Sequence, residues 1–431
     1  IPEHWVRWLE ESLALRGSDS AGKFHDTHET ARGTLEIILL HQQHGSAEQK
    51  QPIVQYASEN PISVIVIDGV PPANGAFPED GSFAAARWDS TTMELHLARG
   101  GSGQQPLYML DLGAAGDGVV FCSIPTPLLW IAKELALHGD DPMIATQRYL
   151  QLGYITGDHT LLAPVRVVPL QQTSSRVMES QTTEPLEILH QSRSPATDLD
   201  ALMNQLGQPF ADTTLLPRYW MYQVARKQMR SMHDDSLILH DEDRHRLLMT
   251  VVRWHWLLSF LPDERNPAVH ASKNWMKFGV TSVDNICSAA LIQRITGHPL
   301  VDPIQPSKTG SSLQQLQRFD RDHRLPDCVM RGVDACAMAA GLEVYVVKTS
   351  TKHVCSVESI PLAAWLASAQ SEIGLLAGDL FLSSNAFQGL PIDRNEVIAM
   401  LDDHRSSRMD YSQQLFALLT LGLWLRLGQK P

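Results

Sequence analysis

The densest group of side chains able to do chemistry is HDEDRHR, His240 to Arg246. Imidazole and carboxylate groups bind metal ions such as Zn²⁺, and on a helix His240 and Asp243, or Asp241 and His245, would share a side. The same acidic residues open a helical pattern, where negative charge complements the helix dipole. We therefore predict a solvated, charge-capped helix start here, with a metal site as the alternative.

Three other stretches contain groups that could contact a ligand. RFDRDHR, Arg318 to Arg324, alternates charges, and we interpret it as a surface loop with local ion pairs. Gly100 to Gly103 is glycine-rich like a phosphate loop, but it lies between two expected strands, so we predict a hairpin turn. RWHWLL, Arg253 to Leu258, has the spacing of a helix whose Trp254 and Leu257 face a core rather than a nucleic-acid base.

The cysteines do not follow a metal or disulfide pattern. They number five, an odd count, and no two have CxxC spacing, so we expect neither a disulfide framework nor a zinc knuckle. This usage is typical of a reducing compartment, and no secretory signal is visible, so we expect a cytoplasmic protein. The cysteines are Cys122, Cys287, Cys328, Cys336 and Cys355.

Composition excludes several classes of protein. The chain has 431 residues, a formal net charge of -13 and 43% hydrophobic residues. So apolar a chain can bury enough surface to fold, and its net field repels phosphate, so we expect no nucleic-acid partner. No apolar run is long enough to span a bilayer, so we expect no membrane partner. The length suggests two or three domains.

Hydrophobic periodicity predicts a β-rich first part. Trp5, Trp8, Leu9 and Leu13 recur at helical spacing, and the helix should stop at Gly17. Short strands are expected at Ile37–Leu40, Ile62–Ile67, Phe83–Trp88, Met93–Ala98, Leu107–Leu110 and Val119–Cys122. Short helices are expected at Leu128–Ala136 and Ile144–Gly153.

The second part is predicted to be mostly helical. Residues 171–199 are polar and without periodicity, which is typical of a linker. Helices are expected at Ala201–Leu206, Leu216–Met232, Glu242–Leu261, Ser282–Ile295, Leu313–Phe319, Cys328–Ala340, Pro361–Ser368, Arg394–Leu401 and Tyr411–Leu427. In the last of these, one face is apolar. Only Leu342–Val347 has the pattern of a strand.

Nine stretches of the sequence occur in the same order as the motifs of one enzyme family. In the first half they are ALRGSDSAGKFHD from Ala14, DGSFAAARWD from Asp80, LHLARGGSGQQPLY from Leu95, FCSIPTPLL from Phe121 and YLQLGYITGDHTLLAPVRVVPL from Tyr149. In the second half they are QPFADTTLLP from Gln208, RLPDCVMRGVDACAMAAGLEV from Arg324, IPLAAWL from Ile360 and RMDYSQQLFALLTLGLWLRL from Arg408.

Together these stretches resemble the glutamine-dependent (class B) asparagine synthetase family, which includes β-lactam synthetases and lasso-peptide cyclases. The first is similar to an RGPDxxG turn, and the stretch from Arg324 is similar to YLPDDxLxKVDRASMAxGLEA. The resemblance implies an α+β chain. Residues 1–170 would form an αββα amidotransferase-like (Ntn-type) glutaminase domain, 171–199 a linker or shortened segment, and 200–431 a mostly helical α/β domain that adenylates a carboxylate.

The resemblance weakens at the glutaminase motifs. The family attacks glutamine with the thiolate of an N-terminal Cys, but this chain begins with Ile1 and its first cysteine is Cys122. The family holds glutamine with an Asn-Gly-Glu step, and the comparable step is Asp68-Gly69-Val70, which cannot offer the same donor and carboxylate. Glutamine hydrolysis is therefore either lost or carried by residues that are missing from this sequence.

The nucleotide motifs are also altered. The family's SGGxDS turn does not occur, and its second glycine-rich stretch is replaced by DDSLILHDEDRHR, Asp234 to Arg246, which has no glycine. Without glycine the backbone cannot come so close to phosphate groups. Either the fold is retained for binding alone, or segments that carry the catalytic loops are absent from the sequence as given.

The resemblance assigns few residues of this chain to a site. Asp68 and Gly69 match degenerate glutamine-binding positions, and Asp320 matches an acidic residue near the acceptor pocket. Asp334 matches the Asp of VDRASM, and we interpret it as structural. No catalytic residue is assigned, and no metal ligand.

The expected function is ATP-dependent amide formation on a small-molecule or peptide carboxylate, with ATP and Mg²⁺ as cofactors. The alternative is an inactive relative that stabilises or regulates a biosynthetic complex. We expect a homodimer or a partner in such a complex.

Overall fold

The computed structural model describes most of both halves of the chain. The described residues are 1–17, 20–30, 33–43, 53–57, 62–69, 76–78, 82–101, 103–113, 118–139, 141–161, 164–170, 194–228, 231–234, 287, 289–301, 309, 314, 318–346 and 360–427. The motifs His240–Arg246 and Arg253–Leu258 and the expected helix Glu242–Leu261 lie outside these residues.

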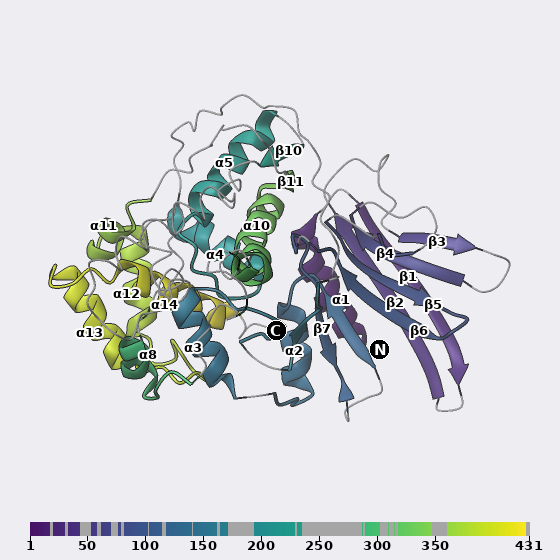
Figure 1. Ribbon diagram of the computed structural model, residues 1–431, viewed down its shortest axis with the longest axis horizontal. Coiled ribbons are helices and arrows are strands. Elements are labelled where there is room, and N and C mark those ends of the chain that lie inside the picture. The colour runs from purple at the N-terminus through teal and green to yellow at the C-terminus, as the bar shows by residue number, and fades with distance from the viewer. Residues whose placement is uncertain are drawn as a thin grey trace.

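The described strands of the first half form antiparallel sheets (Figure 1). One sheet pairs β1 (Ser20–Thr30) with β2 (Gly33–Gln43). A second has the order β3 (Ile53–Ala57), β4 (Ile62–Asp68), β5 (Ala84–Asp89) and β6 (Glu94–Arg99). In a third, β7 (Tyr108–Asp111) lies between β8 (Val119–Cys122) and β9 (Arg166–Val167). The β-rich first part that the sequence predicts is confirmed.

The first two sheets pack face to face. Phe24 of β1 and Leu39 of β2 share a buried cluster with Val64 of β4 and Trp88 of β5. Alternate strand residues point to opposite faces of a sheet, so Ile65 of β4 belongs to a separate cluster on the other face. Two stacked sheets are the arrangement that the resemblance implies for this half.

Helices cover the third sheet. The first helix, α1 (Glu3–Leu13), contributes Trp5, and α2 (Thr126–Glu134) contributes Leu128 and Ile131, to a cluster with Leu110 of β7 and Val167 of β9. Among the described residues, the cluster on the outer face of the four-stranded sheet contains no helical residue. The second helical layer of an αββα arrangement therefore stays a prediction.

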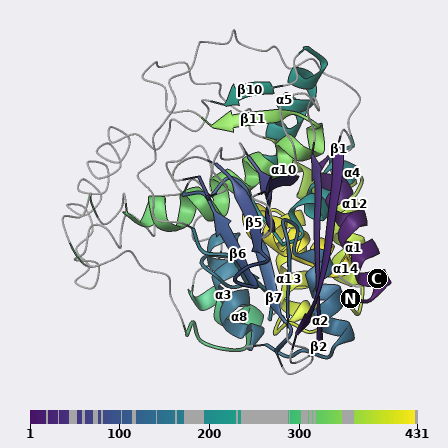
Figure 2. The ribbon, with the colours of Figure 1, turned by 90° about the vertical axis from the view of Figure 1, so that its right-hand side faces the viewer.

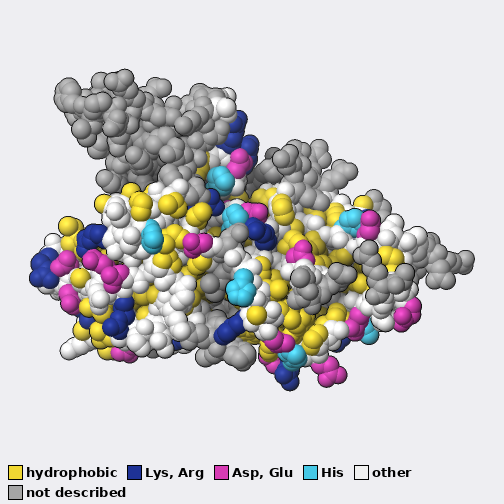
Figure 3. All heavy atoms as spheres, turned by 90° about the horizontal axis from the view of Figure 1, so that it is seen from below, with side chains coloured by type: hydrophobic (Ala, Val, Ile, Leu, Met, Phe, Trp, Pro, Cys, Tyr) yellow, Lys and Arg dark blue, Asp and Glu magenta, His cyan; other side chains and the backbone are white. Residues whose placement is uncertain are grey.

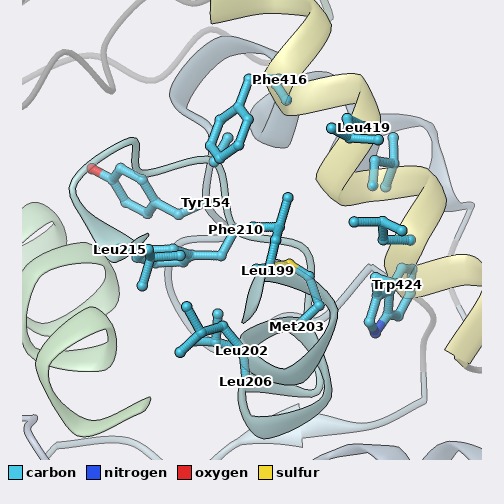
Figure 4. Packing of buried hydrophobic residues seen from close by; sticks show 14 of the residues in the cluster. Tyr154, Leu199, Leu202, Met203, Leu206, Phe210, Leu215, Phe416, Leu419 and Trp424 are labelled. Atoms are coloured by element: carbon cyan, nitrogen blue, oxygen red, sulfur yellow. The ribbon is translucent and has the colours of Figure 1, made fainter. Parts of the chain in front are cut away.

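The second half is a helical assembly around one apolar core (Figure 1). Its described helices are α4 (Pro195–Leu206), α5 (Leu215–Gln228), α8 (Ala289–Thr296), α10 (Met330–Ala340), α11 (Leu362–Ala367), α12 (Glu372–Leu382), α13 (Arg394–Arg405) and α14 (Ser412–Leu427). The segment η5 (Asp320–Val329), a stretch of π-helix, leads directly into α10. Figure 4 shows Leu199, Leu202 and Met203 of α4 in one cluster with Leu419 and Trp424 of α14.

The last helix, α14, is buried on every side. The expectation of a single apolar face is wrong, because the residues from Leu415 to Leu425 are all buried. A helix that is apolar all round lies in the centre of a core. At Gly422 an added Cβ would lie 2.5 Å from Cδ2 of Leu380, so glycine lets α12 approach α14 closely.

The structure differs from several predicted elements. The helix expected over Leu216–Met232 ends at Gln228, and β10 (Ser231–Asp234) follows. It pairs in parallel with β11 (Glu343–Val346), as Figure 2 shows. No strand is expected from the residues of β1, because they are mostly polar, and Phe24 is the buried one among its described side chains. The helix α12 was also not expected.

The core of the second half includes residues that precede the expected domain boundary at residue 170. Tyr149 and Leu150 of α3 (Pro142–Leu152), together with Tyr154 and Leu161, belong to the core of the second half. Most of the expected linker lies outside the described residues, and Pro195 already begins α4. The division into domains at this point stays a prediction.

Two further findings bear on partners. None of the described helices is both long and apolar enough to cross a bilayer. On the face seen in Figure 3, acidic and basic side chains are mixed at the end formed by the C-terminal helices. Exposed ion pairs in the C-terminal half include Arg294 with Glu396 and Arg408 with Asp403.

Candidate functional site

Buried charges meet where the two halves of the chain touch, and Figure 1 shows α10 between the strands and the helices. We call this layer the junction. Its residues are Arg16, Asp68, Arg99, Gln104 and Tyr108 from the first half, and Gln208, Asp327, Arg331, Asp334 and Val344 from the second.

Arg16 connects the halves through two carboxylates. It ends the 3-10 turn η1 (Ala14–Arg16) that follows α1. Its Nη2 donates to Oδ2 of Asp68 at 2.8 Å and to Oδ1 of Asp334 at 3.0 Å, and its Nη1 donates to Oδ2 of Asp334. The planar guanidinium thus binds Asp334 with two parallel hydrogen bonds, the strongest geometry for such a pair.

The charged state of Arg16 is favoured strongly. Burial opposes the charge, but Asp334 and then Asp68 outweigh it and raise the pKa of Arg16 above its ordinary value. Burial raises the pKa of the Asp334 carboxyl, and Arg16 acts in the opposite direction. Asp334 is 6% exposed, which agrees with its interpretation as structural.

Asp68 and Gly69, the expected glutamine-site positions, have structural contacts here. Asp68 ends β4 and its Oδ2 accepts from Arg16. Gly69 has φ of 144°, and an added Cβ would lie 2.8 Å from Cβ of Phe83 and 3.0 Å from the carbonyl oxygen of Ser82. Only glycine fits at this turn. A role for either residue in binding glutamine stays a prediction.

Asp320 is not brought next to Asp68 by any described contact. It begins η5, and its side chain lies outside what the structure describes. The loop expected over Arg318–Arg324 is wrong, because the segment is helical, and Arg324 is only 2% exposed. The expected surface position holds for Arg321 and Asp322, which form a local ion pair. The alternating charges are typical of a solvated loop. The sequence does not show that the following residues of η5, Pro326 and Asp327, contact Gly103 and Gly157 of the first half.

The glycine-rich stretch that begins at Gly100 forms part of the junction. The hairpin expected here is wrong, because β6 pairs with β5 whereas β7 pairs with β8 and β9. The stretch instead passes from one sheet to another. Gly103 has φ of 70°, and an added Cβ would lie 2.6 Å from Cβ of Pro326 in η5. The next residue, Gln104, donates from Nε2 to the carbonyl of Val344 at 2.7 Å.

Two more arginines are buried near this stretch. Arg99 donates to the carbonyls of Gln105, Val168 and Gly103 at 3.1, 3.0 and 3.3 Å. Burial, followed by the positive charge of Arg331, lowers the pKa of Arg99 to about 10. Sequence reasoning missed Arg16, Arg99 and Arg331. A basic residue inside an apolar run, as in LHLARGG and CVMRGVD, was the signal available.

The described cysteines are unsuited to nucleophilic attack. Cys122, Cys287, Cys328 and Cys336 are all buried. Burial raises the pKa of the Cys122 thiol to about 11 and that of Cys287 to about 12, so neither is a thiolate at neutral pH. In the part of the chain that the structure describes, no cluster of His, Cys, Asp and Glu could hold a metal ion. The metal alternative at His240–Arg246 lies outside it.

The parallel pair β10–β11 is the second place where a ligand could bind. Ser231 pairs with Glu343 and Asp234 with Val346, so both strands run toward the same edge. In α/β sheets, ligands bind beyond the carboxyl ends of parallel strands. Residues 235–246, which the resemblance aligns with a nucleotide loop, follow β10 directly and lie outside the described residues.

No protein-family model matches this chain, and no curated protein matches it.

Proposed function

We propose that the protein is an ATP-dependent amide-forming ligase of the asparagine-synthetase type, whose amine does not come from glutamine hydrolysed by this chain. A carboxylate would attack ATP to give an acyl-adenylate and pyrophosphate. An amine would then displace AMP and lose a proton, forming the amide. The observation that carries the proposal is the parallel pair β10–β11, with α5 and α10 beside it, in the segments that resemble an adenylating domain.

The amine source follows from the first half. Glutamine hydrolysis needs an exposed, activated thiolate, and the four described thiols are buried. The carboxylate of Asp68 is already bound to Arg16. Free ammonia or a substrate amine is therefore the proposed nucleophile, and the substrate would be a small-molecule or peptide carboxylate.

The sequence lacks the glycine-rich nucleotide loops of the related enzymes. Asp234–Arg246 contains no glycine, so its backbone cannot form the close phosphate cradle of the related enzymes. ATP and Mg²⁺ would need other contacts, and those cofactors remain part of the proposal.

Exchange of labelled pyrophosphate into ATP tests the adenylation step. The full chain, with Mg²⁺, ATP and a panel of carboxylic acids, should catalyse exchange with at least one acid. Ammonium or a free amine should then give amide, whereas glutamine should not, and glutamate release should stay at background. The variant Cys122→Ser is the matched control, and it should behave as the parent does. Glutamate release that Cys122→Ser abolishes would contradict the proposed amine source.

The second candidate is a non-catalytic partner in a biosynthetic complex. It is favoured by the Arg16 contacts, because they join the halves through a position that the resemblance assigns to glutamine binding. Absence of exchange with every acid, together with no rise in Tm on adding Mg²⁺ and ATP, would select this candidate. Light scattering after size exclusion would show whether the chain forms a homodimer.

A further inference from the structure

Arg331 and Gln208 form a buried pair within the junction. Arg331 lies near the start of α10, and Gln208 lies just after α4. Nη1 of Arg331 donates to Oε1 of Gln208 at 3.0 Å. The two side chains are 5% and 3% exposed, so bulk water does not solvate them.

This pair has donors without acceptors. Nε and Nη2 of Arg331 and Nε2 of Gln208 are buried, and no atom of the residues that the structure describes accepts from them. Turning the Gln208 amide over does not help, because it would place an NH₂ group against the guanidinium. The aromatic ring of Tyr108 lies 5.4 Å from Cζ of Arg331, but a ring contacts the face of a guanidinium and leaves its in-plane N–H groups unused.

The surrounding charges increase the need for an acceptor. Burial and then the positive charge of Arg331 lower the pKa of Arg99. The N–H groups of Arg99 already donate to three backbone carbonyls. Asp327 attracts both arginines, but its Oδ2 accepts from the backbone N–H of Gly157 at 3.0 Å. Asp334 is occupied by Arg16. Two guanidinium groups are thus buried together, and the nearby carboxylates are shared with other donors.

We propose that Arg331 and Gln208 form a binding site for an oxyanion, the carboxylate or phosphate group of a small molecule, at the junction of the two halves. The fork of an arginine matches two oxygens of such a group, and a neighbouring amide N–H completes the contact. Because Tyr108 and Arg99 come from the first half and Arg331 and Gln208 from the second, a bound oxyanion stabilises their association. This site does not depend on the proposed ligase activity.

Calorimetric titration of the full chain tests the site, with sodium phosphate and sodium acetate as separate probes at constant ionic strength in chloride. We expect saturable binding of one oxyanion per chain. Binding of phosphate alone assigns a phosphate group, and binding of acetate alone assigns a carboxylate. Binding of both supports the shared oxyanion chemistry. If neither probe binds, the proposal is overturned.

Variants separate this site from general salt effects. Arg331→Met keeps an unbranched apolar stem without the guanidinium donors and should weaken binding at least about tenfold. Gln208→Leu should weaken it severalfold, and it serves as the second variant if Arg331→Met does not fold. Arg294→Met, at an exposed arginine paired with Glu396, is the control and should bind as the parent does. Equal affinity in Gln208→Leu, Arg294→Met and the parent would overturn the proposal.

Discussion

The junction and the core around α14 are both buried, but different forces hold them. The junction contains Arg16, Arg99, Asp327, Arg331 and Asp334, each at most 6% exposed. The core around α14 consists of hydrophobic side chains, among them many leucines, Phe416 and Trp424. Apolar contacts depend on volume and tolerate exchange of similar side chains, whereas a buried charge depends on one particular partner. The comparison teaches that the apolar core should tolerate exchange of similar side chains, whereas the junction depends on particular charged partners.

The largest effect is expected from Arg16→Met at the junction. It leaves Asp334 buried without its partner, and loss of one member of a buried pair costs about 3–5 kcal/mol of unfolding free energy. The double variant Arg16→Met/Asp334→Leu should recover much of this loss, since no charge is then stranded. Urea unfolding monitored by circular dichroism measures both. Additive losses in the double variant would show that the pair is not coupled.

The next effect is expected in the apolar core. Leu419 is fully buried in α14, so Leu419→Ala should cost about 2–5 kcal/mol through lost contacts and a cavity. Leu419→Met nearly conserves volume and should cost less than about 1.5 kcal/mol. Thermal unfolding of the two variants side by side checks the difference. Similar losses in both would mean that this core demands a particular shape, which would remove the contrast with the junction.

A smaller loss is expected for Gly422→Ala. The added Cβ would press on Leu380, at a cost of about 1–3 kcal/mol, while alanine favours the helix by about 1 kcal/mol. The net loss should be about 1 kcal/mol in urea unfolding. In a Leu380→Ala background the contact is gone, so the same change should be neutral or stabilising. A loss of equal size in both backgrounds would contradict the close approach of α12 and α14.

The smallest effect is expected at the rim of the junction. The side chain of Asp68 is 35% exposed, so solvent screens its pair with Arg16, and Asp68→Ala should cost less than about 1 kcal/mol. Comparing this loss of unfolding free energy with that of Arg16→Met is informative, because Asp68 and Arg16 belong to the same set of hydrogen-bonded charges. Denaturant titration measures the two together. A loss from Asp68→Ala as large as that from Arg16→Met would place the energetic centre of the junction at Asp68 instead.

Local pattern was sufficient for most elements. Val119–Cys122 forms a strand as expected, and the start of the chain forms the expected helix. Elements with a weak local signal were missed, among them the polar β1 and the short β10, which pairs with the expected strand β11. A strand whose side chains are mostly polar gains its stability from the neighbour it pairs with, and that neighbour is not visible in its own residues.

For the candidate site, the sequence indicated some of the residues but not the contacts between them. Asp68, Gly69 and Asp334 were singled out by resemblance, but the contacts of Asp68 with Arg16 and of Arg16 with Asp334 were not foreseen. Arg331 and Gln208 carried no expectation, because an arginine beside apolar residues is equally consistent with a solvated helix face.

The sequence by itself determined most of the helices and the apolar strands, and the apolar character of α14, because these depend on periodicity and hydrophobicity along a short window. The tertiary structure alone decided which charges meet. Arg16 and Asp334 are 318 residues apart in the chain, and the energy of a buried ion pair arises only when folding removes water from both groups at one place.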